Sequence, residues 1–146
     1  MGKKRQARES ALQILFQLEF DETQVDTIIP QYWEDRKASQ EVMESSAGLV
    51  KGVVSHLEAI DSIIQGVSEN WRLSRMALID RNILRIATYE LFFGEDLAPA
   101  IIMNEAIEIA KKYSGDQSAT FINGILDAMN KKTDALNTTL KVEGND

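Results

Sequence analysis

Apolar residues recur at helical spacing along most of the chain, and they are densest in residues 76–93. Successive residues of an α-helix advance by about 100° around its axis, so this segment carries apolar side chains over roughly half of its circumference. Its remaining arc holds Arg81, Arg85 and Thr88. A helix with so wide an apolar face is expected to lie at the centre of the fold, with other helices packed around it.

Apolar stripes at spacings of three and four predict further helices on both sides of the central one. The predicted helices cover residues 5–20, 25–33, 39–68, 99–113 and a last segment that is capped by Asp116 or Ser118. Pro30 lies inside the second stripe, so that helix is expected to start just before Pro30 or to kink there. Ser39 is the expected N-cap of the third. No stretch alternates as a strand does, which makes all-α the expected fold class.

Smaller features of the pattern lead to further expectations. Gly48 and Gly52 are four residues apart, which permits close approach of another helix, and Gly115 is expected to end a helix. Asn104, Glu105, Glu108, Lys111 and Lys112 are expected to form an outer face, on which Glu108 and Lys112 make an i, i+4 ion pair. Tyr32 and Trp33 are interpreted as packing residues in preference to base-stacking ones.

The length of 146 residues fits one domain, or two small helical halves that share a core. We expect a domain over residues 1–132, with halves of about 1–70 and 71–132, followed by a loose polar tail at 133–146. The composition is 44% hydrophobic and 27% charged, with no apolar run long enough to span a membrane. The chain lacks Cys, which suits a cytoplasmic protein.

Charge and motif content narrow the function classes. The net charge of −7 weighs against general attraction to nucleic acid, yet Lys3, Lys4, Arg5 and Arg8 form a local basic cluster. That cluster is either a phosphate-binding feature or a solubilising terminus. No phosphate-binding glycine loop, nucleophile elbow or HExxH motif occurs, and His56 is the only histidine. We therefore expect no enzyme activity, no metal and no cofactor, and interpret His56 as structural.

Three segments carry a resemblance to a known family. They are RQARESALQILF at residues 5–16, ILRIATYEL at residues 83–91, and the stretch from Ile102 to Asp127 that ends in FINGILD. In order and spacing they resemble the NusB family of bacterial transcription antitermination factors. The resemblance implies an all-helical fold of two small subdomains. It also implies pairing with the ribosomal protein NusE, binding of the boxA element of nascent ribosomal RNA, and action on RNA polymerase in an antitermination complex.

The resemblance also implies roles for individual residues. The RNA-contacting positions of the family match a basic opening and the start of the last helix: Lys4, Arg5, Arg8, Gln117, Thr120 and Phe121. Phe16 and Asp80 match positions linked to partner binding. From the pattern alone, Phe121 is either a core residue or a base-stacking one, and Asp80 either caps the central helix or faces a basic partner.

Two function classes follow from these observations. The first is an RNA-binding transcription factor that works with NusE. The second is a helical protein-interaction module without specific RNA binding, in which the basic start is incidental. Salt-dependent binding to a boxA RNA distinguishes them. Helical faces this apolar also allow a homodimer.

Overall fold

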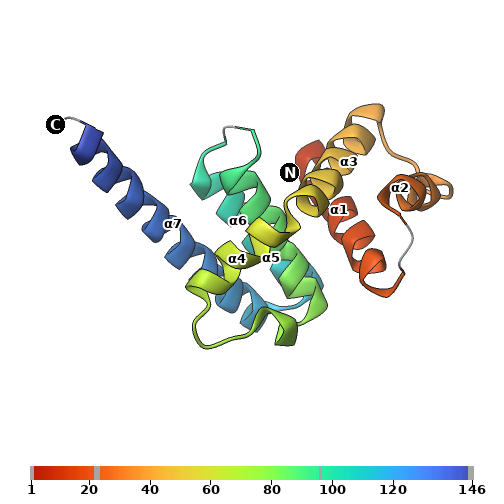
Figure 1. Ribbon diagram of the computed structural model, residues 1–146. Helices are drawn as coiled ribbons and strands as arrows, with labels where there is room; N and C mark the ends of the chain where they lie inside the picture. The colour runs from red at the N-terminus through yellow and green to blue at the C-terminus, as the bar shows by residue number, and fades with distance from the viewer. Residues whose placement is uncertain (1, 22–23, 96, 145–146) are drawn as a thin grey trace.

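The computed structural model describes residues 2–21, 24–95 and 97–144, and from residue 134 onward it describes the backbone only. Within this part the chain forms seven α-helices and one short 3₁₀ helix, with no strand (Figure 1). The all-α prediction is confirmed. The helices are α1 (Gly2–Phe20), α2 (Val25–Trp33), α3 (Gln40–Ser55), α4 (Leu57–Val67), η1 (Leu73–Arg75), α5 (Leu78–Phe92), α6 (Pro99–Tyr113) and α7 (Asp116–Gly144).

Helix α5 lies at the centre of the fold, as its apolar pattern predicts. It packs against α1, α3, α4, α6 and α7. Ile83, Leu84, Ile86 and Ala87 are buried along its length. Even its predicted polar arc is partly enclosed, because the Thr88 side chain is fully buried and its hydroxyl contacts the Met129 sulfur at 3.6 Å. Helix α5 therefore positions five of the other helices directly, whereas α2 packs on α1 and α3.

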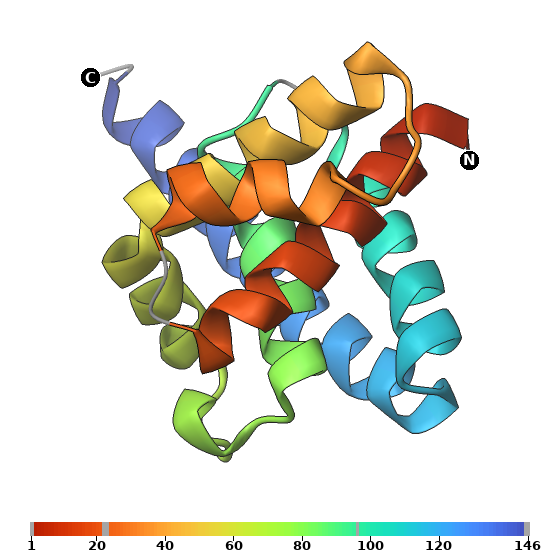
Figure 2. The same cartoon turned by 90° about the vertical axis from the view of Figure 1, so that its right-hand side faces the viewer.

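The helices gather in two groups, α1–α3 and α4–α7, which lie on opposite sides of Figure 1. Figure 2 shows α1 crossing in front of α5, with α6 beside it. One continuous apolar core joins the groups, since it contains residues of α1 and α3 as well as of α4 to α7. The change from one group to the other falls at His56, so that α4 lies with the second group.

The expectation of one helix over residues 39–68 is wrong, because the chain breaks at His56. The backbone there leaves the helical region, with φ −111° and ψ 19°. The ring Nδ1 hydrogen-bonds the Gly52 carbonyl oxygen at 2.9 Å, and the ring stacks on Phe93 at 4.3 Å between centroids. The apolar stripe continues through the break, which hides the break in the sequence pattern. The bend lets both α3 and α4 pack against α5.

The two helical glycines of α3 differ in their surroundings. At Gly52 an added Cβ would lie 2.2 Å from the Tyr89 ring, so α3 and α5 approach closely there, as predicted. At Gly48 the same atom would meet nothing within 4 Å, so the prediction is wrong for that residue.

Most predicted helix ends are confirmed. The Ser39 hydroxyl accepts a hydrogen bond from the Val42 amide at 3.2 Å, Pro99 opens α6, and Gly115 follows it with φ +105°. Helix α2 begins well before Pro30, at Val25. Helix α7 already begins at Asp116, so neither Asp116 nor Ser118 is its cap.

The predicted tail begins within α7, whose backbone stays helical to Gly144. In Figure 1 this last part of α7 projects away from the other helices. The side chains of residues 134–144 lie outside the described part, so the expectation that the tail does not dock stays a prediction.

Candidate nucleic-acid and partner interface

The basic start of α1 is largely enclosed by carboxylates. Arg8 is only 5% exposed and donates three hydrogen bonds to Glu90 of α5, from Nε to Oε1 at 2.9 Å and to Oε2 at 3.2 Å, and from Nη2 to Oε2 at 3.0 Å. A guanidinium that is buried and paired in this way holds two helices together. Arg8 therefore does not offer a free charge at the surface.

Arg5 makes a similar contact with α6. Its Nε lies 2.5 Å from Oε2 of Glu105, which is 9% exposed. The expectation that Glu105 belongs to an outer face is therefore wrong, because α1 covers it. Burial alone would raise the pKa of Glu105, but the hydrogen bond and charge of Arg5 outweigh it, and the pKa of Glu105 lies below its ordinary value. The same hydrogen bond raises the pKa of Arg5.

Among the basic residues near the start of α1, Lys4 is the exposed one without an ion pair in the described part of the chain. It lines a hollow of about 390 Å³ together with Arg8, Glu44 and Glu95. Lys3 pairs with Glu41 at 3.0 Å.

The ion pairs of α6 differ from the prediction. Lys112 pairs with Glu9 of α1 at 2.6 Å, and Glu108 pairs with Lys111 at 3.5 Å. The predicted pair of Glu108 with Lys112 is therefore wrong.

Gln117, Thr120 and Phe121 lie together in the first turns of α7. Gln117 and Thr120 are exposed, and the Thr120 hydroxyl donates to the Asp116 carbonyl at 3.1 Å. Phe121 is half-buried: it packs against the apolar core and its ring meets Trp71 edge to face at 5.8 Å. The packing of Phe121 on the core agrees with the first interpretation, and base stacking by the exposed part of its ring stays a prediction.

The structure does not bring the two groups of predicted RNA-binding residues to one point. Arg5 contacts α6 at Glu105, whereas Gln117 follows the end of α6. From Glu105 to Tyr113 the axis of α6 advances about 12 Å. The start of α1, α6 and the start of α7 run along one side of the molecule in Figure 2. An extended strand can follow such a side, whereas a compact ligand cannot reach both groups.

The two predicted partner-binding residues have different exposures. Phe16 is half-buried and its ring meets Phe20 edge to face at 5.2 Å, and Phe20 is 71% exposed. Asp80 is 8% exposed, and its Oδ2 accepts a hydrogen bond from the Ser118 hydroxyl at 3.1 Å. Asp80 therefore links the first turn of α5 to the first turn of α7.

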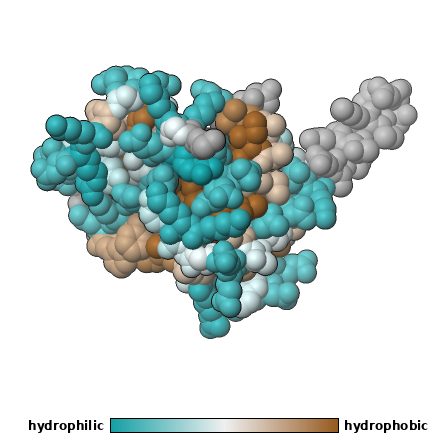
Figure 3. All heavy atoms as spheres, turned by 180° about the vertical axis from the view of Figure 1, so that it is seen from behind, coloured by the Kyte–Doolittle hydropathy of each residue, from teal (hydrophilic) through white to brown (hydrophobic). Residues whose placement is uncertain are grey.

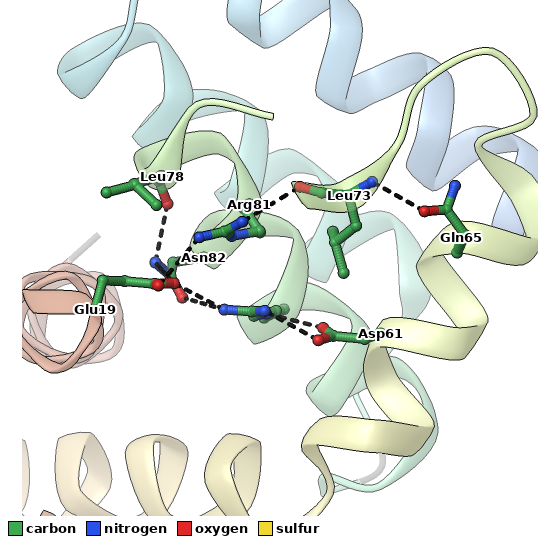
Figure 4. A network of polar contacts seen from close by, with 8 residues as sticks. Glu19, Asp61, Gln65, Leu73, Leu78, Arg81 and Asn82 are labelled. Atoms are coloured by element: carbon green, nitrogen blue, oxygen red, sulfur yellow. Dashed lines mark hydrogen bonds and ion pairs between the residues drawn. The ribbon is translucent and has the colours of Figure 1, made fainter. Parts of the chain in front are cut away.

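A polar network beside these residues joins α1, α4 and α5 (Figure 4). Glu19 accepts from Arg81 at 3.0 Å and from Arg85 at 2.9 Å. Arg85 also binds both oxygens of Asp61, at 2.9 and 3.0 Å. The two arginines of the predicted polar arc thus point between helices. Sequence spacing does not reveal these contacts, because the partners are more than twenty residues apart.

Sequence reasoning also missed Trp71, which lies between the helices predicted at residues 39–68 and 76–93. Trp71 is 59% exposed and lies against Phe121. The signal is the sequence WRLSR at residues 71–75, in which an aromatic residue stands beside two arginines. Aromatic and basic residues together are typical of surfaces that bind single-stranded nucleic acid.

The described part of the chain shows few further features that suggest a ligand or a membrane. On the face shown in Figure 3, apolar side chains form separate patches among hydrophilic ones. None of the helices, over the residues that are described, is long and apolar enough to cross a membrane. In that same part of the chain, no group of three or more His, Cys, Asp or Glu side chains is arranged to hold a metal ion.

The fold and the site together define an all-helical protein in which the basic start of α1 and the polar start of α7 lie at opposite ends of α6, along one side of the molecule. The model of the NusB family matches residues 5–131, and a curated NusB relative from Anaeromyxobacter sp. (strain Fw109-5), a transcription antitermination protein, is 45% identical over 86% of the chain and 87% of its own length. The chain belongs to the NusB family.

Solved structures agree with this assignment. T. maritima NusB is 36% identical, with a TM-score of 0.80 over 88% of this chain and 90% of that one. A structure of antitermination factors NusB and NusE in complex with double-stranded RNA gives a TM-score of 0.81, at 26% identity, over 90% of this chain and 98% of that one.

Proposed function

We propose that the chain is a transcription antitermination factor that binds the boxA element of nascent ribosomal RNA together with the ribosomal protein NusE. The complex then helps RNA polymerase to read through terminators. The observation that carries the proposal is the likeness, over nine tenths of this chain, to one chain in the solved complex of the antitermination factors NusB and NusE with double-stranded RNA. The antitermination relatives, which match over nearly the same length, support it.

The contacts at the start of α1 support different roles for its basic residues. Lys4 is exposed and takes a phosphate directly. Arg5 binds a phosphate only by giving up part of its contact with Glu105. This exchange costs free energy, because the Glu105 carboxylate is nearly buried and loses part of its compensation. Arg8 holds α1 on α5 through Glu90 and so positions Lys4. The exposed Gln117 and Thr120 contact the same RNA at the start of α7.

The partner site combines the half-buried Phe16 and the exposed Phe20 with the acidic Glu19 beside them. Phe16 and Phe20 present rings at the end of α1, close to Glu19 of the polar network. Such rings suit the buried centre of a protein interface. Asp80 acts through α7, because a direct contact with NusE would require its neighbours to move aside.

We infer that this activity is binding, without catalysis, and that it takes place in the cytoplasm, where transcription occurs in bacteria. The net charge of −7 leaves the isolated chain with weak attraction for RNA. A basic partner adds phosphate contacts, so the pair binds more tightly than either component. By linkage, RNA tightens the contact between the two proteins by the same factor.

A titration of fluorescently labelled boxA RNA with the chain, with NusE and with both tests the proposal. The expected result is salt-dependent binding that is strongest for the pair and weaker for an RNA of scrambled sequence. If the chain binds NusE and neither component gains affinity for boxA RNA, it is a protein-interaction module, and the proposal is wrong.

A further inference from the structure

Trp71 is held at the surface by its backbone, with little help from burial of its ring. The Trp71 carbonyl oxygen accepts hydrogen bonds from the Ser68 hydroxyl and from Nε2 of Gln65, both at 2.9 Å. Gln65 also fixes the next turn, because its Oε1 accepts from the Leu73 amide at 2.9 Å. The connection between α4 and α5 is thereby fixed, while 59% of Trp71 stays exposed. A large indole in a rigid connection is set for contact with a ligand.

The indole forms one wall of a hollow beside the start of α7. Its ring stands at 82° to that of Phe121, so the two rings make a corner. The hollow has a volume of about 240 Å³ and is also lined by Asn70, Thr120, Gly124 and the exposed Glu69, which is the one acidic residue in its lining. The exposed Asn70 carries an amide of the kind that hydrogen-bonds to base edges. A flat ring with polar edges fits a corner of this shape.

The charges around Trp71 distinguish it from the start of α1. Arg72 and Arg75 are exposed, and the described part of the chain contains no ion pair to either. The arginines of α1, by contrast, are both paired with carboxylates. Arg72, the residue after Trp71, lines a second hollow together with Asp61, Ser74 and Arg81. Unpaired cations beside an exposed ring favour an anionic, aromatic ligand over an apolar protein surface.

We propose that Trp71 and Phe121 form a base-stacking corner of the RNA surface, with Arg72 and Arg75 binding the adjoining phosphates. The ligand is a nucleotide of single-stranded RNA, and the corner extends the path along α6 and α7 toward the α4–α5 connection. This inference rests on the proposed function. It adds a recognition element that lies away from the basic start of α1.

The intrinsic fluorescence of Trp71 gives a direct test. The variant Trp33→Phe leaves Trp71 as the only tryptophan, and the indole nitrogen of Trp33 has no hydrogen bond to lose within the described residues. Addition of boxA RNA to this variant, with NusE present, is expected to quench the emission along the same isotherm as an independent anisotropy measurement. Binding with unchanged Trp71 emission overturns the inference and leaves the proposed function intact. Absence of RNA binding by the wild-type pair overturns both.

Two sets of variants separate stacking from phosphate contact. Trp71→Ala is expected to weaken RNA binding about tenfold with an unchanged salt slope, and Trp71→Phe to recover most of the affinity. Arg72→Gln with Arg75→Gln is expected to lower the log–log salt slope by about 1.4, from two phosphates. Arg36→Gln with Lys37→Gln removes the same charge from the α2–α3 connection and is expected to leave the slope unchanged, because that connection lies far from the α4–α5 connection in Figures 1 and 2.

Protein docking at the same corner predicts a different outcome. In that case Trp71→Ala weakens the affinity for NusE, with RNA binding by the isolated chain unaltered, and the inference is overturned. Thermal melting of each variant checks that the fold is kept. We expect the fold to be kept, because the hydrogen bonds that fix Trp71 are made by its backbone carbonyl and not by its ring.

Discussion

Arg8 and Glu90 bind each other side by side across the junction of α1 and α5, with each carboxylate oxygen receiving its own hydrogen bond. Their side chains are 6% and 9% exposed, so each charge is compensated by the other and hardly by water. This relationship ties the basic start of the chain to its central helix.

Removing one partner of that pair is expected to destabilise the fold strongly. Arg8→Ala leaves Glu90 as a buried, uncompensated charge and is expected to lower the free energy of unfolding by about 3–5 kcal/mol in urea denaturation. The double variant Arg8→Met/Glu90→Met fills the same space with apolar atoms and is expected to be at least as stable as the wild type, or close to it. If the double variant also loses about 0.7 from the salt slope of RNA binding, Arg8 contacts a phosphate in the complex.

The glycines of α3 provide a matched pair of substitutions. Gly52→Ala places a methyl group against the Tyr89 ring and is expected to cost about 1–3 kcal/mol of unfolding free energy. Gly48→Ala has open space around it and is expected to stabilise α3 by up to about 1 kcal/mol, since alanine favours helix interiors. Equal effects of the two changes in chemical denaturation would contradict the close approach of α3 and α5.

The contact of Arg5 with Glu105 predicts a dependence of stability on pH. The pKa of Glu105 lies below its ordinary value near 4.5, so this contribution is fully present above pH 4.5 and is lost as the pH falls through the folded-state pKa. In Arg5→Gln the burial remains without the cation, and the pKa is expected to rise. Carboxyl-carbon NMR titration of Glu105 measures both values.

Thermal melts over the acidic range complete that test. Arg5→Gln is expected to lose stability most at neutral pH and least in acid, where Glu105 becomes protonated. Lys3→Gln is the control, because its partner Glu41 is well exposed and the pair contributes little. A Glu105 carboxyl that titrates alike in wild type and Arg5→Gln would show that the ion pair does not persist in solution.

Truncation after Thr133 is expected to leave the melting temperature within about 2 °C of the full chain, because Met129 is the last buried residue among those of α7 whose side chains are described. Circular dichroism should lose helical signal only in proportion to the residues removed. A chain that ends at Gly124 lacks the buried Ile125, Leu126 and Met129 and is expected to lose cooperative unfolding. A large drop on the shorter truncation would show that the tail docks.

Helical periodicity was sufficient to predict the elements of this fold, because each helix buries one continuous stripe. It failed at His56, where the stripe continues through a break that depends on a ring stacked on Phe93, far along the chain. It also placed Glu105 at the surface, since nothing in the spacing of α6 indicates that Arg5 covers it. Local pattern identifies which face is apolar, and tertiary contacts decide which charges are enclosed.

The candidate site was predictable to a similar extent. The resemblance identified Lys4, Gln117 and Thr120, which are exposed, but it could not show that Arg8 is enclosed by Glu90. Trp71 carried a local signal in the arginines that follow it. Its contact with Phe121 could not be predicted from the sequence, because that contact exists only where the fold brings α7 beside the α4–α5 connection.

The dependence of α1 on α5 and α6 has a consequence for synthesis on the ribosome. Arg8 is made 82 residues before Glu90, and at about 5–20 residues per second this interval lasts roughly 4–16 s. During that time α1 lacks both Glu90, the buried partner of Arg8, and the apolar surface of α5 on which α1 packs. Its basic residues are then open to any nearby polyanion, the ribosome's own RNA included, and the nascent chain closes its core only after the buried residues of α7, as far as Met129, have emerged.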